Sequence, residues 1–413
     1  MIKAWFRIPL WQRVIGALIL GVITGLIWGP EAESIKWIGD LFIKAIKMLV
    51  VPLIFFSLVA GVAAIGDLRK LGSVGGRAIL LFLATGAASV ILGLTLGTVI
   101  APGAGLDISL PAGTVVPEPQ ETTAIDMILG MVPGNPVEVM VNTDVLPLIV
   151  FAILFGIGIL MAGEDGAPMT KAMDAGSTVM QKMTILVMEL TPFGVFALIA
   201  WVAGSLGLEA LLPLAKLLAL NYFGCGLIIL IIYPLVIKLL TKNLHIVDFF
   251  RGIVDAQAVA YSTASSNATL PVTLRCVQRN LGVSKSVSSF VVALGATVNM
   301  NGTAMYLGLA TLFGAQAFGV TLGVTEYILV AITATLGSVG AAGVPGAGLI
   351  MMSLVFGVAG VPLETIALVA GIDRIMDMMR TMTNITGDAT VAVAVGHMMD
   401  EIDVEEFESA DDV

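Results

Sequence analysis

The chain has 413 residues, of which 58% are hydrophobic and 12% are charged, and its mean hydropathy is +1.01. A soluble domain of this length carries about twice that share of charged side chains, so a soluble protein is excluded. The net charge of −10 comes mainly from residues 399–413, which hold eight acidic side chains and no basic one, and without a basic patch no nucleic-acid partner is expected.

Long apolar segments predict membrane-spanning helices, because about 20 helical residues cross a bilayer. The first segment continues past Arg13 without a cleavage signal, so we expect a first span and no cleavable signal peptide. The sequence therefore predicts an all-α membrane protein with eight transmembrane helices. In chain order the spans are expected at residues 10–29, 39–65, 77–100, 124–163 (broken), 176–206, 209–240, 284–312 and 362–398.

Two further apolar segments, 247–275 and 326–358, are interrupted at their middles by "SSNATLP" and "GAAGVPGAG". Non-helical backbone at membrane depth is tolerated only where protein or a water-filled cavity satisfies its polar groups. We therefore predict two re-entrant helical hairpins whose tips lie inside the protein. Ordinary kinked spans are the alternative.

The placement of lysine and arginine predicts the orientation of the spans. No basic residue occurs in 78–170, 183–215 or 286–373. Eight spans and two hairpins bring every basic cluster to the cytoplasmic side, with both termini cytoplasmic and only Lys36 as an exception. The order hairpin, span, hairpin, span indicates an inverted repeat, which commonly places a substrate site near the membrane midplane.

The last span contains "GIDRIMDMMRTMTNITGDA", residues 371–389, with three aspartates and two arginines. A charge facing lipid at the midplane costs about 2.5–3.5 kcal/mol, so these side chains are expected to face protein or water. At about 100° per residue, the strongly polar side chains share an arc of about 100° on one helix face. The stripe comprises Asp373, Asp377, Arg380, Thr381, Asn384 and Asp388, with Arg374 at its edge.

Both signs of charge on one face indicate a site for a zwitterion and a cation. Arg380 can bind a carboxylate in bidentate fashion, and Asp377 can accept from an ammonium group. Asp388 offers hard oxygen ligands to a small cation. The structural alternative is a buried ion-pair network without a ligand.

A second polar segment, "GATVNMNGTAMY" at residues 295–306, lies in the middle of another span. Gly302 is expected to loosen the helix and to free carbonyl oxygens for a cation. The alternative for Asn299 and Asn301 is hydrogen bonding between helices.

An intramembrane enzyme is a competing interpretation, since "DRIMD" places Asp373 and Asp377 four residues apart, where they could hold Mg²⁺ for prenyl transfer. Such chemistry needs a second acidic cluster on a facing element. Glu189 and Asp255 stand alone in the sequence, so the chain is not expected to be an enzyme.

The motifs "SSNATLP", "NMNGT", "AAGVPGAG" and "DMMRTMTNITGD", in this order, resemble the dicarboxylate/amino acid:cation symporters, the glutamate transporter family. The likeness covers nearly the whole chain. It implies a homotrimer in the cell membrane, surrounded by lipid, that works by an elevator mechanism. The implied divisions are 1–70 (scaffold helices 1 and 2), 71–105 (transport-domain helix 3), 106–240 (scaffold helices 4 and 5 and transport-domain helix 6), 241–398 (transport core) and 399–413 (acidic disordered tail).

By this likeness, Arg380 binds the side-chain carboxylate of the substrate and Asp377 binds its amino group. Because both are present, an acidic amino acid, aspartate or glutamate, is implied. Further substrate contacts are implied for Thr303, Thr381, Asn384, Ser266, Gly343, Val344 and Gly348. Sodium is implied at two sites, one formed by Asp388 with the backbone of Gly295, Asn299 and Asn384, the other by the backbone carbonyls of Thr297, Met300, Ser338, Val339 and Ala341.

The chain also departs from the family pattern. Asn301 replaces an aspartate, and Phe82, Thr85 and Gly86 replace a tyrosine and a Thr-Ser pair, so a third sodium site would lack its formal negative charge. The presence of an arginine at position 374 on the charged helix resembles the pattern of proton-coupled bacterial members of the family. Sodium is favoured as the coupling ion. The alternatives are a proton-coupled glutamate/C4-dicarboxylate symporter and a passive anion channel.

Overall fold

The computed structural model describes residues 8–63, 74–106, 129, 132–142, 145–205, 207, 211–241, 244–339, 343 and 345–409. Its named elements are all helices, as the sequence predicts. They are α2 (Leu10–Trp28), η1 (Gly29–Ile35), α3 (Lys36–Ala63), α5 (Gly76–Ile100), α7 (Pro136–Asn142), α8 (Val145–Ala162), η3 (Gly163–Gly166), α9 (Ala167–Met188), α10 (Thr191–Ser205), α11 (Leu211–Leu227), η5 (Ile228–Ile232), α12 (Tyr233–Leu240), α13 (Ile246–Thr263), α14 (Ser266–Arg275), η6 (Cys276–Asn280), α15 (Lys285–Val298), α16 (Asn301–Ala317), α17 (Val324–Val339), α18 (Ala347–Ala359), α19 (Glu364–Met398) and α20 (Val404–Glu408).

Five helical segments of the described chain are long and apolar enough to cross a membrane. The expected span at 176–206 begins earlier and is two helices, α9 and α10, separated at Glu189 and Leu190. Pro192 explains this break, because proline lacks an N–H and fits the first turn of a new helix. The expected broken span at 124–163 contains α7 and α8, and its residues 124–128, 130–131 and 143–144 lie outside the described residues.

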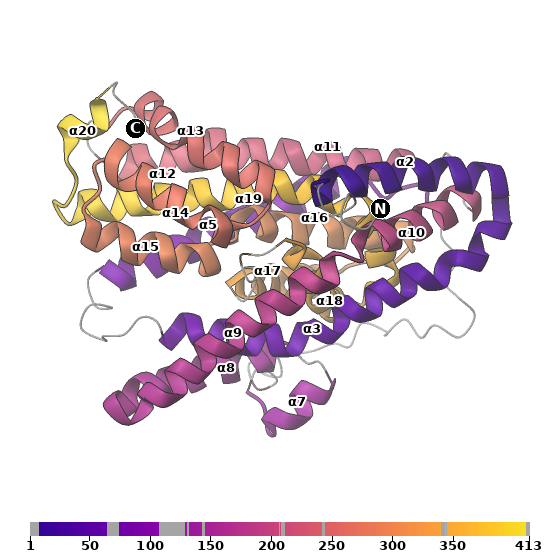
Figure 1. Cartoon of the computed structure of the whole chain (residues 1–413), viewed down its shortest axis with the longest axis horizontal. Helices are drawn as coiled ribbons and strands as arrows, with labels where there is room; N and C mark the ends of the chain where they lie inside the picture. The colour runs from indigo at the N-terminus through magenta and orange to yellow at the C-terminus, as the bar shows by residue number, and fades with distance from the viewer. Residues whose placement is uncertain are drawn as a thin grey trace.

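The longest helix, α19, runs along the long axis of the molecule (Figure 1). It contacts α10, α11, α12, α13, α15 and α16, so its whole circumference is enclosed by other helices. A second group, α3, α8 and α9, packs together along the lower edge of the view. The charged stripe of the last span therefore lies on a helix that is enclosed by other helices over most of its length.

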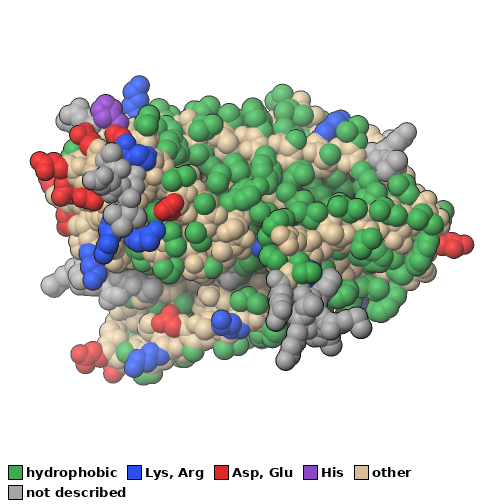
Figure 2. All heavy atoms as spheres, turned by 45° about the horizontal axis from the view of Figure 1, so that its top comes forward, with side chains coloured by type: hydrophobic (Ala, Val, Ile, Leu, Met, Phe, Trp, Pro, Cys, Tyr) green, Lys and Arg blue, Asp and Glu red, His purple; other side chains and the backbone are tan. Residues whose placement is uncertain are grey.

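On the face shown in Figure 2, hydrophobic side chains cover much of the surface between the two ends of the long axis. Charged side chains gather at the end where α20 lies. Large apolar side chains such as Leu230, Ile231 and Leu239 are exposed on α12 and the segment before it. A hydrophobic belt of this kind is what a lipid-facing surface requires.

The two interrupted segments are helix pairs, α13 with α14 and α17 with α18. The first pair breaks at Ala264, which adopts a left-handed conformation with φ of 50°. Ser265 then caps α14 by accepting a hydrogen bond from the N–H of Ala268. The carbonyl of Gly343 accepts bonds from Ser265 Oγ at 2.7 Å and from Asn267 N at 3.1 Å, so the two breaks meet.

The acidic tail, residues 399–413, is expected to be disordered, and this prediction is wrong as far as Ser409. Phe407 is fully buried, and Glu401 accepts hydrogen bonds from Ser284 and Ser286. The physical reason is that apolar residues alternate with the acids, so one face of the segment packs while the carboxylates stay at the surface.

Candidate functional site

The polar stripe of α19 is buried, as its periodicity predicts. The residues Asp373, Asp377, Arg380, Asn384 and Asp388 are all 5% exposed or less, and Arg380 has no exposed surface. This burial requires that every charge on the stripe have a partner.

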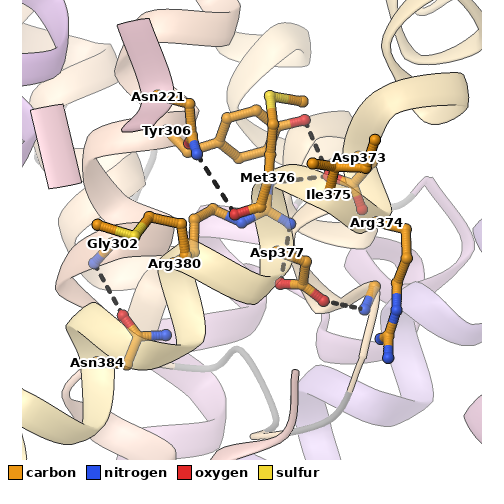
Figure 3. Close-up of polar contacts among 12 residues, drawn as sticks. Asn221, Gly302, Tyr306, Asp373, Arg374, Ile375, Met376, Asp377, Arg380 and Asn384 are labelled. Carbon is orange, nitrogen blue, oxygen red and sulfur yellow. Dashed lines mark hydrogen bonds and ion pairs between the residues drawn. The ribbon is translucent and has the colours of Figure 1, made fainter. Parts of the chain in front are cut away.

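Arg380 forms an ion-pair network on the middle of α19 (Figure 3). Its Nη1 donates to Asp373 Oδ1 at 2.8 Å and its Nη2 donates to Asp377 Oδ1 at 2.9 Å. The guanidinium lies 3.9 Å from the centre of the Tyr306 ring, and the Tyr306 hydroxyl donates to Asp373 Oδ1 at 3.0 Å. The ion pairs anticipated as a structural alternative are therefore present.

The amino end of α18 approaches this network from the second helix pair. The second oxygen of Asp377 accepts a hydrogen bond from the backbone N–H of Gly346 at 2.9 Å. Gly348 lies so close that a Cβ there would be 3.0 Å from Arg380 Nη2. The structure thus brings Gly348 to the predicted substrate-binding pair, whereas Val344 lies outside the described residues.

Gly302 allows α16 and α19 to approach each other closely. A Cβ at Gly302 would lie 2.6 Å from the carbonyl oxygen of Arg380, and its N–H donates to Asn384 Oδ1 at 2.8 Å. Gly302, which is expected to loosen the helix, is the second residue of α16. The interruption lies earlier, at Asn299 and Met300, and Gly302 serves helix packing.

Thr303 and Thr381, the remaining predicted side-chain contacts on these two helices, are both 4% exposed. Ser266 is 2% exposed at the start of α14. All three hydroxyl-bearing residues are therefore buried inside the protein. Their predicted contacts with a substrate stay predictions.

One predicted cation site is assembled around Asp388. Asn299 Nδ2 donates to Asp388 Oδ1 at 2.9 Å, and Gly295 leaves room for this carboxylate, since a Cβ there would be 2.5 Å from it. Asn299 Oδ1 is buried without a hydrogen-bond partner. A carboxylate beside an unpartnered amide oxygen is the chemistry that a small hard cation requires. Asn384, whose backbone is the fourth predicted ligand, accepts a hydrogen bond from Gly302 N through its side-chain oxygen and donates from its side-chain nitrogen to the sulfur of Met300.

The second cation site is predicted to consist of backbone carbonyls, and it stays a prediction. Thr297 Oγ1 donates to Leu294 O at 3.0 Å and Ser338 Oγ donates to Thr335 O at 2.8 Å, each within its own helix. The Met300 carbonyl accepts from Ala304 N at 2.8 Å. The backbone of Val339 is the last of α17, and Ala341 lies outside the described residues.

The residues of α5 that correspond to the family's third sodium site are Phe82, Thr85 and Gly86. Thr85 Oγ1 donates to the carbonyl of Leu81 at 2.8 Å, and Gly86 faces Asn301, with a Cβ position 3.6 Å from Asn301 Oδ1. Phe82 is buried. These residues are brought together, but they offer no charged ligand. Among the described residues no group of three or more His, Cys, Asp and Glu side chains could hold a metal ion.

Sequence reasoning did not assign roles to several residues of this site. Tyr306 shares a helix face with Thr303, three residues earlier, and this spacing indicates that Tyr306 faces the same site as Thr303. Asn221 donates to Met376 O at 3.3 Å and Tyr222 donates to Ile375 O at 2.9 Å, beside the charged stripe. Two adjacent polar residues inside an apolar span are themselves an indication of an interior contact.

Comparison with known proteins agrees with this geometry. Residues 10–398 match the model of the sodium:dicarboxylate symporter family. The chain belongs to the sodium:dicarboxylate symporter family. It is 36% identical over 394 residues to the proton/sodium-glutamate symport protein of Geobacillus stearothermophilus, covering 93% of this chain and 92% of the relative.

The names of two other relatives of this symporter state different substrates. The C4-dicarboxylate transport protein of Bacillus subtilis is 36% identical over 397 residues, covering 95% of this chain and 94% of the relative. The proton/glutamate-aspartate symporter of Escherichia coli is 35% identical over 403 residues, covering 93% and 91%. The family consists of membrane symporters, so the enzyme interpretation is excluded, as the sequence analysis expects.

Proposed function

We propose that this symporter carries acidic amino acids, aspartate or glutamate, together with a coupling cation. The observation that supports this most directly is the fully buried Arg380, paired with Asp373 and Asp377. A substrate carboxylate can replace Asp377 on Nη2 of Arg380 without leaving the arginine unpaired. Asp377 is then free to accept from the ammonium group of the same substrate. This exchange of partners suits an amino acid better than a simple dicarboxylate, which offers no ammonium group.

Sodium is the proposed coupling ion, and Asp388 with Asn299 is its proposed site. The unpartnered Asn299 Oδ1 and the buried carboxylate supply two hard oxygens. Asn384 lies one turn before Asp388 on α19 and bonds to Gly302 on α16. Binding of a cation there would therefore fix the crossing of α16 and α19, and with it the position of Arg380.

We further propose that the chain crosses the cell membrane eight times, with α13–α14 and α17–α18 as re-entrant hairpins and both termini cytoplasmic. The meeting of the two helix breaks at Gly343 supports this arrangement. In the proposed mechanism the chain forms a homotrimer, and its first, second, fourth and fifth spans contribute the scaffold. The third and sixth spans and the core of residues 241–398 slide with the substrate as an elevator.

A proton-coupled glutamate/C4-dicarboxylate symporter is the second candidate. Asn301 removes a formal charge from the cation-binding region, and Arg374 adds a second guanidinium beside the stripe. Both changes favour a site that is less dependent on sodium. The names of the relatives include both kinds of substrate and both coupling ions.

Uptake of radiolabelled L-aspartate into proteoliposomes tests these proposals, with sodium and proton gradients imposed separately. We expect sodium-driven accumulation that is lost in Arg380→Cys. Arg275→Cys is the matched control, since Arg275 is an exposed arginine on α14 and should leave uptake unchanged. Unchanged uptake by Arg380→Cys would overturn the substrate assignment. Chloride current without substrate accumulation would indicate a channel.

A further inference from the structure

Arg374 is a buried arginine whose hydrogen-bonding capacity is largely unused. It is 6% exposed, and its Nη2 donates to the carbonyl of Thr263 at 3.1 Å. Its Nε and Nη1 are buried with no hydrogen-bond partner. Leaving donors of a charged group unpaired is strongly unfavourable, so such a group indicates a partner that arrives from outside the chain.

The position of Arg374 suits an anionic partner. Thr263 is the last residue of α13, and the chain turns through Ala264 into Ser265, the cap of α14. Arg374 therefore stands beside the amino end of a ten-residue helix, where backbone N–H groups and the helix dipole favour negative charge. Two independent features, the unpaired guanidinium and the helix terminus, point to the same kind of ligand.

Arg374 also lies beside the network of Arg380. Figure 3 shows the two guanidinium groups on either side of the Asp377 carboxylate in this view. The order of charges is positive, negative, positive. An acidic amino acid carries the complementary set, a carboxylate, an ammonium group and a second carboxylate.

We infer that Arg374 binds the α-carboxylate of the substrate, the one that Arg380 does not hold, together with the amino end of α14. This inference rests on the proposed acidic amino acid substrate and adds a second arginine to its recognition. The residue then determines specificity, because a ligand with only one carboxylate leaves Arg374 unpaired. The competing role is structural: Arg374 caps the carboxyl end of α13 through Thr263 and touches no ligand.

Amide analogues of the substrate separate the two roles. Unlabelled L-aspartate, its α-amide and its β-amide compete with labelled L-aspartate in proteoliposomes, and the ratio of inhibition constants measures each carboxylate. In the wild type, the α-amide binds about tenfold to a hundredfold more weakly than aspartate. In Arg374→Gln the inhibition constant of the α-amide should approach that of aspartate, which removes the α-amide penalty. The β-amide should still bind more weakly than aspartate, so the β-amide penalty remains. A structural role would instead weaken all three ligands by one factor.

Two further measurements keep the inference testable. Arg374→Lys retains the charge and loses the planar fork, so its α-amide penalty should be intermediate, and this variant serves if Arg374→Gln does not fold. Arg275→Gln is the control and should show both penalties intact. An α-amide penalty equal to that of the wild type in either folded Arg374 variant overturns the inference.

Failure of the proposed substrate would give a different result. A wild type that accumulates succinate but not L-aspartate contradicts the acidic amino acid assignment. In that case, succinate and its mono-amide replace aspartate and its amides as the competing ligands in the uptake assay. Loss of discrimination between them in Arg374→Gln supports a carboxylate contact at Arg374, and unchanged discrimination overturns it.

Discussion

The side-chain amide of Asn301 donates a hydrogen bond of 3.0 Å to the hydroxyl of Tyr233, which donates one of 2.9 Å to the backbone carbonyl of Thr383. Asn301 is 1% exposed and Tyr233 is fully buried. Tyr233 has one proton, and the amide allows its oxygen to accept while its proton is given to Thr383. A neutral chain of hydrogen bonds thus joins α12, α16 and α19 where the family resemblance places an aspartate.

Asn301→Asp should break this chain. The new carboxylate has no proton to donate, so it and Thr383 would compete for the single proton of Tyr233. We expect a loss of about 1–3 kcal/mol in unfolding free energy without sodium, because a buried acceptor is left unsatisfied. Sodium should restore stability more steeply than in the wild type, since a cation can neutralise the new charge.

Thermal unfolding in detergent, with sodium replaced by choline, measures both effects. Tyr233→Phe is the control: it removes the bonds to Asn301 and Thr383 without adding charge, so it should destabilise the protein without a new sodium dependence. Equal sodium dependence in Asn301→Asp and the wild type would contradict the prediction.

Gly302→Ala should separate α16 from α19, because the added Cβ would lie 2.6 Å from the Arg380 carbonyl oxygen. Overpacking of this kind costs about 1–3 kcal/mol. Aspartate uptake should fall strongly because the Arg380 network shifts with the helix. Gly226→Ala is the matched control, since nothing lies within 4 Å of a Cβ at that α11 position and alanine favours helix there. Equal uptake and stability in the two variants would show that the contact tolerates a methyl group.

Arg13 on α2 binds Glu189, which stands at the break between α9 and α10. Nη1 of Arg13 is 2.6 Å from Glu189 Oε2, and the side chains are 4% and 32% exposed. Removing one partner leaves a buried charge, so Glu189→Gln should destabilise the protein by about 1–3 kcal/mol after allowance for the exposed side of the pair. Arg13→Gln/Glu189→Gln should lose less than the sum of the single changes, and an additive result in thermal unfolding would rule out the coupling.

Helical periodicity was sufficient to predict the stripe on α19, because charged side chains inside a membrane must face protein or water rather than lipid. It also predicted the helix breaks near Ser265 and Gly343, since their composition cannot continue a helix. The contact of Arg380 with Tyr306 could not be predicted, because Tyr306 lies on a helix that is separated from α19 by a long stretch of chain. The close packing of Gly302 against α19 could not be predicted for the same reason, because it depends on the tertiary contact of two helices that are far apart in the sequence.

The pH dependence of the tail follows from Glu401. Hydrogen bonds from Ser284 and Ser286 stabilise its carboxylate and lower the pKa of Glu401 below its ordinary value of 4.5. A lowered pKa means that the docked tail is stabilised above pH 4.5 and that this stabilisation is lost as pH falls through the lowered value. Hydrogen exchange at the buried Phe407, corrected for the intrinsic rate, should therefore accelerate in acid.

Glu401→Gln tests this linkage directly. The neutral side chain should loosen the tail at pH 7 and remove most of the acid dependence of exchange at Phe407. Glu405→Gln is the matched control, because Glu405 is exposed on α20 and no hydrogen bond of its carboxylate is described. Acid-dependent exchange that persists unchanged in Glu401→Gln would assign the pH response to another group.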